Sequence, residues 1–523
     1  MKRRLAGGLL LAAAGLAAGC GTVTAAREGE DSPPAEERPN IVLIVTDDQT
    51  QAAFSAKTMP RTARFFSEAG TRFTDAIVTT PVCCPSRATM ITGQYAHNHR
   101  VLSNKLGYPA LAQKRNVLPV WLQRAGYNTL HVGKYLHKWR SVVGNHVAPG
   151  WTEWHTQRGA RYYDYRLAHA GWLKGPERYG HAADDHLSLV LNKIARRVVR
   201  RYAALDAPLY LQFDAFAPHY DNGRSRSQRC RGERAVPAPT DLGRFADAEL
   251  PRSAAFNERD LSDKPRFLQR LPPITAAGER RIRRSWRCAL AATLAVDRGF
   301  AAIAKELAAQ GELERTAFIF ISDNGYAYGE HRARQGKQLP YEELIRVPLL
   351  ASLPAGLGEE PRPRRLDLTV ANLDIAPTIL DLAGARPCRG DRCRRLDGRS
   401  LVAPLAGERS DRGFVDRALA IEYGSATDRN YSAVSPCSYR GVRVGGRVLV
   451  EHTRVPVREA AGGRCRRQRE HEYYDLTRDP DQLHNSYRGK AGQARLLRRM
   501  RRLSRCSGIP GRDKQAPGVP YCE

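Results

Sequence analysis

The fold is decided by the stretch Asn40–Asp48, which reads NIVLIVTDD. Between Asn40 and Thr46 it holds five consecutive apolar residues with no polar side chain among them. Such a run is typical of a strand that is buried on both faces of a parallel sheet. The strand ends in two adjacent carboxylates, Asp47 and Asp48. Because open α/β sheets place their sites at the carboxyl ends of strands, we expect a functional site here.

Further strands follow the same pattern. Ala317–Ser322 is again apolar and ends in a polar pair, Asp323 and Asn324. Leu209–Phe213 is a third such strand, and it leads to Ala217–His219. Helices are expected between and after the strands, at 118–125, 286–309 and 372–383. This alternation predicts a doubly wound α/β domain.

The length of the chain predicts more than one structural unit, because 523 residues exceed what a single hydrophobic core usually organises. We assign a large α/β domain to residues 39–410 and a small C-terminal α+β domain to residues 411–523. In the second part, short strand-like pieces such as 439–451 precede a basic helix near 494–505. The Arg- and Pro-rich segment 224–263 is expected to be a surface insertion that could act as a lid.

The first twenty residues form an export signal. Lys2, Arg3 and Arg4 precede an apolar run that ends before Cys20 and is shorter than the ~20 residues of a spanning helix. The small residues before Cys20 resemble a bacterial lipobox, which implies a lipid on Cys20 and a membrane lipoprotein that faces outside the cytoplasm. An ordinary cleaved signal and an uncleaved anchor are the alternatives. Residues 21–38, rich in Ala, Glu and Pro, are expected to be a flexible tether.

Cysteine usage fits export to an oxidising compartment. Eight cysteines could form four disulfides, and Cys388 with Cys393 is the natural local pair. The eight are Cys230, Cys288, Cys388, Cys393, Cys437, Cys465, Cys506 and Cys522. The adjacent Cys83 and Cys84 need another explanation.

Composition limits the class of protein and of partner. Hydrophobic residues at 42% and charged residues at 26% are typical of a globular chain and exclude a coiled coil, a collagen-like fibre and a multi-span membrane protein. The net charge of +30 favours a polyanionic partner. The alternative is a codon bias toward Arg, because the basic residues are scattered through the chain. No zinc-finger or RNA-recognition motif is present, so nucleic acid is not expected.

The two polar strand ends predict a metal site. Asp47, Asp48, Asp323 and Asn324 offer only oxygen ligands, which suit Ca²⁺ or Mg²⁺ and suit Zn²⁺ poorly. A hard cation beside a basic pocket indicates chemistry on an anionic ester, where positive charge stabilises the transferring group.

The nucleophile is indicated by a motif. Cys83–Arg87 (CCPSR) resembles the C-x-P-S-R signature of the type I, formylglycine-dependent sulfatases of the alkaline-phosphatase-like superfamily. The resemblance covers about residues 38 to 490 and implies an alkaline-phosphatase-like doubly wound mixed sheet, followed by a smaller C-terminal α+β domain with an antiparallel sheet and a helix. The other matching motifs, in the family's order, are Arg38–Asp48, Gly133–Leu136, Ala217–His219, Ser322–Gly325, Gln335–Lys337 and Glu472–Leu476.

The resemblance implies that a formylglycine-generating enzyme oxidises Cys83. A hydrated aldehyde provides one oxygen to attack sulfur and a second whose deprotonation expels sulfate, which splits a hard step into two easier ones. Arg87 would hold the modified residue, and with Pro85 it is read by the converting enzyme. Cys84, at the variable position, is expected to be a small buried residue.

Matching residue by residue implies the remaining roles. Lys134 and Lys337 correspond to the sulfate-binding lysines, and His219 to the histidine near the leaving oxygen, where it could donate a proton. The Ca²⁺ ligands would be Asp47, Asp48, Asp323 and Asn324, with residue 83 as a further ligand.

One departure points to a branch of the family. Many sulfatases carry His two positions after the lysine of the Gly-Lys motif, whereas this chain has Leu136 there and His137 one residue later. The form Gly133–Leu136 instead resembles the N-acetylglucosamine-6-sulfatase branch. His137 is thus a candidate substrate contact. His331 could line the pocket or cap a loop.

The leading hypothesis is an exported, lipid-anchored sulfatase that hydrolyses sulfate monoesters, either aryl sulfates or a sulfated sugar such as N-acetylglucosamine-6-sulfate. A phosphate or phosphonate ester hydrolase of the same superfamily is the first alternative, because fold does not settle function. A non-catalytic, polyanion-binding surface lipoprotein is the second, although such a protein would be expected to have lost site residues.

Overall fold

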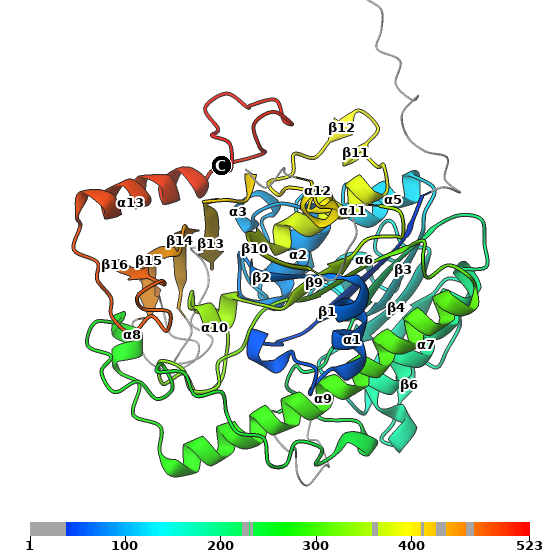
Figure 1. Ribbon diagram of the computed structural model, residues 1–523, viewed down its shortest axis with the longest axis horizontal. Coiled ribbons are helices and arrows are strands. Elements are labelled where there is room, and N and C mark those ends of the chain that lie inside the picture. Colours follow the sequence, from blue (N-terminus) through cyan, green and yellow to red (C-terminus); the bar gives the residue numbers. More distant parts are fainter. Residues whose placement is uncertain are drawn as a thin grey trace, which may run out of the picture. The chain divides into compact units, whose positions relative to one another are not determined.

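The protein is built on a ten-stranded mixed sheet (Figure 1). The computed structural model describes residues 38–221, 230, 234–357, 364–408, 413–424, 436–456 and 465–523. The strands of the large sheet are β1 (Asn40–Thr46), β2 (Thr71–Ile77), β3 (Asn128–Gly133), β4 (Glu153–Arg158), β5 (Tyr165–Ala170), β6 (Arg178–Tyr179), β7 (Leu209–Asp214), β8 (Thr316–Ser322), β9 (Leu349–Ser352) and β10 (Arg364–Ala371). Their spatial order is β10-β2-β9-β8-β1-β7-β3-β4-β5-β6.

The centre of the sheet is parallel. β1 pairs in parallel with β7 on one side and β8 on the other, and β3 pairs in parallel with β7 and β4. Antiparallel pairs, such as β8 with β9 and β4 with β5, lie farther out and make the sheet mixed, as predicted. The carboxyl ends of β8, β1, β7, β3 and β4 therefore meet at one edge, where α/β sheets place their sites.

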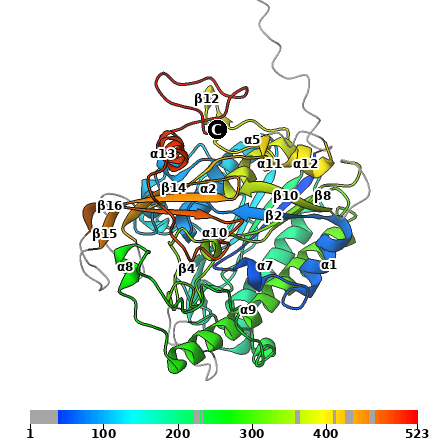
Figure 2. The same ribbon diagram turned by 60° about the vertical axis from the view of Figure 1, so that its left-hand side comes forward.

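Helices cover both faces of this sheet. Figure 2 shows α11 and α12 on one side of β10 and β2, and α1, α7 and α9 on the other. The helices are α1 (Pro60–Ala69), α2 (Cys83–Thr92), α3 (Ala96–His99), α4 (Gly107–Ala110), α5 (Leu118–Arg124), α6 (Arg140–Val143), α7 (Leu187–Tyr202), α8 (Arg266–Gln269), α9 (Ala276–Ala309), α10 (Glu342–Ile345), α11 (Ile375–Leu382), α12 (Val402–Ala406) and α13 (Ala491–Leu503).

The unbroken apolar run of β1 is explained by its place between the two helical layers. Val42 and Ile44 belong to the core shared with α1, α7 and α9. Ile41, Leu43 and Val45 belong to the core shared with α2, α5 and α11. Because successive side chains of a strand point to opposite faces, a strand covered on both sides must be apolar at every position.

Three boundaries differ from the sequence prediction. The helix expected at 286–309 begins ten residues earlier, at Ala276, where the Thr275 hydroxyl accepts from the Gly278 N–H. The helix expected at 372–383 begins with a 3₁₀ turn, Asn372–Asp374. The piece 439–451 is two strands, because Gly445 and Gly446 form a tight turn with φ values of +52° and +69°. Positive φ at both positions of a hairpin turn favours glycine.

The last part of the chain forms an antiparallel sheet in the order β13-β14-β15-β16. Its strands are β13 (Leu419–Tyr423), β14 (Ser438–Val444), β15 (Arg447–Pro456) and β16 (Cys465–Asp475), and α13 packs against it. This agrees with the predicted C-terminal α+β part. Its core also contains Ile77, Val82 and Leu373 from the preceding part, and the domain boundary at residue 410 stays a prediction.

Four disulfides join the eight cysteines that the sequence singled out. The pairs are Cys230–Cys288, Cys388–Cys393, Cys437–Cys465 and Cys506–Cys522. The predicted local pair is confirmed, and its cysteines stand opposite each other in the ladder of β11 (Cys388–Arg389) and β12 (Arg392–Cys393).

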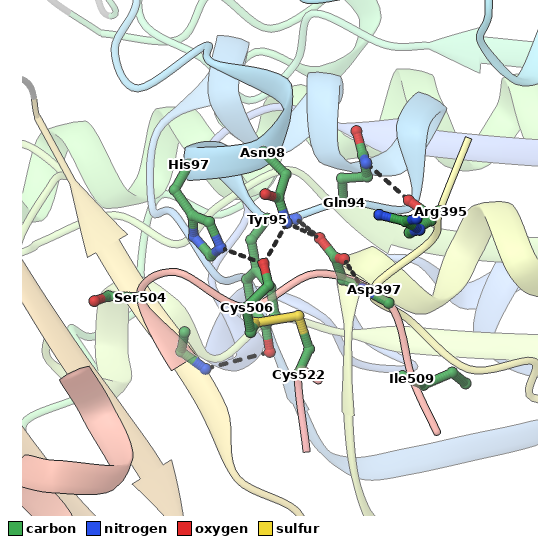
Figure 3. Close-up of a disulfide and its surroundings, with 12 residues drawn as sticks. Gln94, Tyr95, His97, Asn98, Arg395, Asp397, Ser504, Cys506, Ile509 and Cys522 are labelled. Carbon is green, nitrogen blue, oxygen red and sulfur yellow. Dashed lines mark hydrogen bonds between the residues drawn. A yellow bond between two sulfur atoms is a disulfide. The ribbon is translucent and has the colours of Figure 1, made fainter. Parts of the chain in front are cut away.

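The C-terminal segment is hydrogen-bonded to α3, the short helix that follows α2 (Figure 3). The Cys506 carbonyl, beside the disulfide to Cys522, accepts from Asn98 Nδ2 at 2.8 Å and lies 3.1 Å from His97 Nε2. Asp397 accepts from the backbone N–H groups of Tyr95 and Gly508, at 2.8 Å each. Cys506 and Gly508 thus hold the start of the segment against α3 and Asp397, and the disulfide ties Cys522 to the same place.

Some predictions fall outside the described residues. The signal at 1–20, the lipid on Cys20 and all of the tether except its last residue lie there, as does part of the insertion at 224–263. The rest of that insertion is attached to α9, for instance through the ion pair between Asp241 and Arg298 at 2.6 Å. A lid role for it stays a prediction. Among the described residues, no helix has the length and apolarity to cross a membrane.

Candidate active site

The predicted site residues converge at the carboxyl edge of the parallel strands. Asp47 and Asp48 follow β1, Asp323 and Asn324 follow β8, and Lys134 follows β3. All five side chains are buried. The two polar strand ends meet, because the Asp48 N–H donates to Asp323 Oδ1 at 3.2 Å.

Cys83 is the first residue of α2 and lies inside this cluster. Its Sγ donates to Asp47 Oδ1 at 3.3 Å, and Lys337 Nζ donates to the Sγ at 2.7 Å. Burial, together with the negative charge of Asp47, raises the pKa of the Cys83 thiol well above its ordinary value. A buried, protonated thiol is a poor nucleophile. The position is therefore suited to a reacting group, but the unmodified thiol is not.

Arg87 lies one helical turn after Cys83 and contacts three carboxylates. Its Nε donates to Asp323 Oδ2 at 2.8 Å, its Nη1 to Asp214 Oδ1 at 2.7 Å and its Nη2 to Asp47 Oδ2 at 3.3 Å. Burial opposes its charge, but these carboxylates outweigh burial and raise the pKa of Arg87. The guanidinium fixes the start of α2 against the ends of β1, β7 and β8.

Asp214 is a site residue that the sequence analysis missed. It ends β7 and receives hydrogen bonds from Arg87 and from Gln212 Nε2, the latter at 2.8 Å, while His131 Nε2 lies 3.0 Å from its Oδ2. The signal was present, because a carboxylate directly follows the apolar strand Leu209–Phe213, just as Asp47 follows β1.

A glycine lets β3 approach this residue. Gly133 has φ +122°, and a Cβ there would lie 1.9 Å from the Asp214 carbonyl oxygen. Only glycine fits such a close approach. The next residue, Lys134, is thereby brought over the strand ends.

The two predicted lysines both reach the cluster. Lys134 Nζ pairs with Asp47 Oδ2, and Lys337 Nζ lies 2.5 Å from Asp48 Oδ1. Burial opposes their charge, but Asp47 raises the pKa of Lys134 and Asp48 raises that of Lys337. Each lysine is 8% exposed, so its ammonium group can meet an anion that enters from solvent.

The carboxylate cluster has unsatisfied oxygen atoms that fit a cation. Asp48 Oδ2 and Asn324 Oδ1 are buried and accept no hydrogen bond from any described residue. Asp48 also has φ +67°, a strained conformation for a residue other than glycine. Burial and the charge of Asp47 raise the pKa of Asp323 to about 6. The cluster thus offers carboxylate and amide oxygen atoms without enough positive charge around them. Ca²⁺ and Mg²⁺ bind such oxygen atoms.

The charge balance of the site agrees with this fit. The carboxylates of Asp47, Asp48, Asp214 and Asp323 face the cations of Arg87, Lys134 and Lys337. One negative charge is in excess, so a divalent cation would leave one positive charge in excess, which suits an anionic substrate.

His219 lies beside the carboxylates, 3.7 Å from Asp48 Oδ2 and 4.0 Å from Asp47 Oδ1 through its Nε2. Its Nδ1 is 2.7 Å from the Tyr220 carbonyl oxygen, an acceptor, so Nδ1 carries a hydrogen. Burial and Lys134 lower the pKa of His219 well below its usual value. In the neutral ring, Nε2 therefore has a free lone pair. Nε2 also lies close enough to ligand atoms of Asp47, Asp48 and Cys83 to be a possible metal ligand.

The other two histidines that the sequence raised differ in position. His137 is half-buried and lines a cavity of about 580 Å³ together with Lys134, and its N–H donates to Cys84 Sγ at 3.3 Å. Cys84 is buried, as predicted. His331 is held by Glu258 at 2.6 Å and packs on Tyr341, and it does not line that cavity.

Comparisons with known proteins agree with one another. The family model described as Sulfatase matches residues 39–385. Human N-acetylglucosamine-6-sulfatase is 31% identical over 382 residues, which are 71% of this chain and 65% of that protein. The first curated relatives, at 30–32% identity, are longer proteins, of which the matches span 33% to 66%.

Solved structures share the fold. A protein solved in complex with its substrate D-glucosamine-2-N,6-O-disulfate superposes with a TM-score of 0.64 at 22% identity, covering 89% of this chain and 97% of that one. The phosphonate monoester hydrolase of Agrobacterium radiobacter superposes with a TM-score of 0.62 at 20% identity, covering 89% and 95%. At these identities the likeness is one of fold, and the fold alone does not decide which ester is cleaved.

Proposed function

Because the chain belongs to the sulfatase family, we propose that it hydrolyses sulfate monoesters with a formylglycine at position 83 and a bound Ca²⁺. The observation that carries the proposal is the place of Cys83 in the C-x-P-S-R motif. It begins α2 and lies 2.7 Å from one ammonium group, within a buried cluster of carboxylates.

The chemistry of position 83 requires its modification. A formylglycine hydrate would supply one oxygen to attack sulfur and a second whose deprotonation expels sulfate. The raised pKa of the buried Cys83 thiol supports this, because the unmodified side chain would stay protonated. A formylglycine-generating enzyme is then a required partner.

The chain's own residues would orient and neutralise the substrate. We assign sulfate binding to Lys134 and Lys337, and the orientation of residue 83 to Arg87. Ca²⁺, or Mg²⁺ in its place, would be held by Asp47, Asp48, Asp323 and Asn324 with residue 83, and would supply positive charge at the sulfate.

We assign protonation of the leaving oxygen to His219. Burial and Lys134 lower its pKa in the free site, but a bound sulfate ester brings negative charge next to Nε2 and favours the protonated ring. A proton carried on Nε2 would then face the substrate, while Nδ1 stays bonded to the Tyr220 carbonyl. His137 is assigned to substrate binding at the mouth of the site.

The substrate we propose is a sulfated sugar, with N-acetylglucosamine-6-sulfate as the first candidate. The human relative's name and the net charge of +30, which favours polyanionic glycans, support this choice. We further propose that the protein is exported and anchored through a lipid on Cys20. Extracellular relatives, such as the SULF-1 homolog of Drosophila melanogaster, support export.

The test combines a mass measurement with turnover. Protein made beside a formylglycine-generating enzyme is digested with trypsin, and the peptide Phe73–Arg87 is weighed. We expect a lower mass than that of the thiol form, release of sulfate from N-acetylglucosamine-6-sulfate, and no release after Cys83→Ala. Faster turnover of 4-nitrophenyl phosphate than of 4-nitrophenyl sulfate by the converted protein would instead support the phosphate or phosphonate ester hydrolase.

A further inference from the structure

All the fully charged residues that line the cavity beside Lys134 are basic. The cavity encloses about 580 Å³, and the charged groups that line it are Lys134, Lys138, Arg140 and Arg158, with no carboxylate among its lining residues. It adjoins the reacting centre, because Asn104, another lining residue, accepts from the Cys84 N–H at 2.9 Å. A molecule with one end at residue 83 can therefore extend into it.

Two of these basic residues, Arg158 and Arg140, have few partners among the described residues. The only described charged partner of Arg158 is the exposed Glu177, at 3.9 Å, and the Nε of Arg158 is buried without a hydrogen-bond partner. Burial and the nearby charge of Arg140 lower the pKa of Arg158. Among the described residues, the Arg140 guanidinium makes one long contact, 3.5 Å to Asn145 Oδ1. Both guanidinium groups thus line the same cavity, and no carboxylate is among its lining residues.

A neutral acceptor completes the wall. Gln157 is 4% exposed, and its Oε1 has no partner among the described residues, while its Nε2 donates to the Arg161 carbonyl at 3.1 Å. A sugar hydroxyl or amide N–H is the kind of donor that this oxygen lacks.

The sheet fixes the distance of this wall from the reacting centre. β3 and β4 pair in parallel with Gly133 opposite Thr156, so Lys134, the residue after β3, is next in register to Gln157, which is still part of β4. Neighbouring strands are about 4.8 Å apart, which is close to the width of one sugar ring. Arg158 follows one residue farther on.

We propose that Arg140 and Arg158 form a subsite for a second anionic group of the substrate, a sulfate or a carboxylate on the same sugar or on the next one. The inference rests on the proposed sulfatase function and adds the substrate class to it. The preferred substrate is then a glycan with at least two anionic groups. A monosulfated sugar has no second anion for Arg140 and Arg158 to bind.

The test compares substrates that differ in their second anion. Sulfate release is measured from N-acetylglucosamine-6-sulfate, from glucosamine 2-N,6-O-disulfate, and from a disaccharide in which a uronic acid is linked to the 6-sulfated sugar. The variants are Arg140→Gln, Arg158→Gln and the double variant. Arg197→Gln, an exposed arginine of α7, is the matched control.

The native protein should favour a two-anion substrate by about tenfold in kcat/KM, as expected for a charge-assisted hydrogen bond. The double variant should lose that preference through KM, and Arg197→Gln should keep it. A preference for the disulfate assigns the subsite to sulfate, and a preference for the disaccharide assigns it to carboxylate. Equal kcat/KM for all three substrates in the native protein, or an unchanged preference in the double variant, would overturn the subsite.

Failure of the proposed function gives a different result, which is the absence of sulfate release from all three substrates. The subsite is then tested by calorimetric titration of glucosamine 2-N,6-O-disulfate into the native protein and the double variant. About tenfold weaker binding to the double variant supports the subsite, and equal binding overturns it.

Discussion

The ammonium of Lys337 lies 2.7 Å from the Sγ of Cys83. The two residues are 254 positions apart, and the contact forms because the loop after β8 returns over the start of α2. The same ammonium pairs with Asp48, so Lys337 links the position of the proposed nucleophile to the proposed metal ligands. Its charge therefore lies where negative charge would develop during attack on a sulfate.

Replacement of the Lys337 ammonium should lower the rate of sulfate release more than it lowers the stability of the folded protein. Lys337→Gln removes a buried donor aimed at the reacting group, and such donors contribute about 10²- to 10³-fold to kcat. We expect a fall of that size in sulfate release, measured by steady-state kinetics. Lys305→Gln, on the exposed face of α9, is the control and should keep full activity. Turnover of Lys337→Gln within threefold of the native rate would contradict the role of Lys337.

The metal site should depend on Asp48. Its Oδ2 is a buried acceptor that no described residue donates to, so Asp48→Asn removes charge where a cation would bind. We expect EDTA to abolish sulfate release and Ca²⁺ to restore it, with Mg²⁺ as the alternative ion. In calorimetry, Asp48→Asn should weaken Ca²⁺ binding by at least about tenfold, because ligand charge sets affinity.

Asp391→Asn, in an exposed loop, is the matched control for the metal site. It should bind Ca²⁺ as tightly as the native protein. Full activity after exhaustive chelation would argue against a required cation, and equal Ca²⁺ affinity in Asp48→Asn would argue against this set of ligands.

The sequence predicted the parts of the site that follow local rules. An uninterrupted apolar run followed by a polar pair marks a buried strand and its carboxyl end, which is why Asp47, Asp48, Asp323 and Asn324 were found. Parallel strands then bring such ends together whatever their separation in the chain. The hairpin around Gly445 and Gly446 carries an equally local signal, although the sequence analysis treated it as one strand.

The strand end marks Asp214 in the sequence, but its contact with Arg87 and the composition of the cavity wall follow from tertiary structure. The contact between Asp214 and Arg87 spans 127 positions, and its geometry depends on the close approach at Gly133. Nothing near Arg140 or Arg158 in the chain distinguishes them among the many arginines. Only the parallel register of β3 with β4 places Arg158 near Lys134.

Asp214 should act by positioning Arg87. Asp214→Asn keeps the size of the side chain and weakens its hold on the Arg87 guanidinium, which still contacts Asp47 and Asp323. Losses of about 10- to 100-fold are usual for groups that orient a catalytic residue through hydrogen bonds. We expect a loss in kcat with KM within threefold, measured alongside the thermal midpoint. A purely structural role would instead lower the midpoint and leave the kcat of the folded fraction intact.

The two adjacent cysteines should behave differently. Burial raises the pKa of Cys84 to about 12, and its Sγ accepts from the His137 N–H, so its thiol stays neutral and packed. Cys84→Ala should keep turnover and lose about 1 kcal/mol of stability, as buried substitutions commonly do. Cys83→Ala should abolish turnover. Loss of turnover in a folded, converted Cys84→Ala protein would show that Cys84 takes part in the reaction.

The attachment of the C-terminal segment should weaken at high pH. His97 Nδ1 lies 3.0 Å from both carboxylate oxygens of Glu422, and Asp397 adds negative charge. Burial alone would lower the pKa of His97, but Glu422 outweighs it and the pKa rises to about 9. The unfolded value is about 6.5. The folded state therefore binds a proton more tightly, and this stabilisation is complete below pH 6.5 and is lost as pH rises through 9.

We expect the free energy of unfolding to fall by on the order of 2 kcal/mol between pH 6.5 and 9.5, measured by urea titration at fixed pH values. The lowered pKa of Glu422 arises from the same ion pair with His97, so it adds nothing further to this change in free energy. His97→Gln should flatten this part of the pH profile, since Gln carries no proton to lose. The control is His181→Gln, an exposed histidine, which should keep the native slope. An equally steep profile in His97→Gln would place the responsible group elsewhere in the chain.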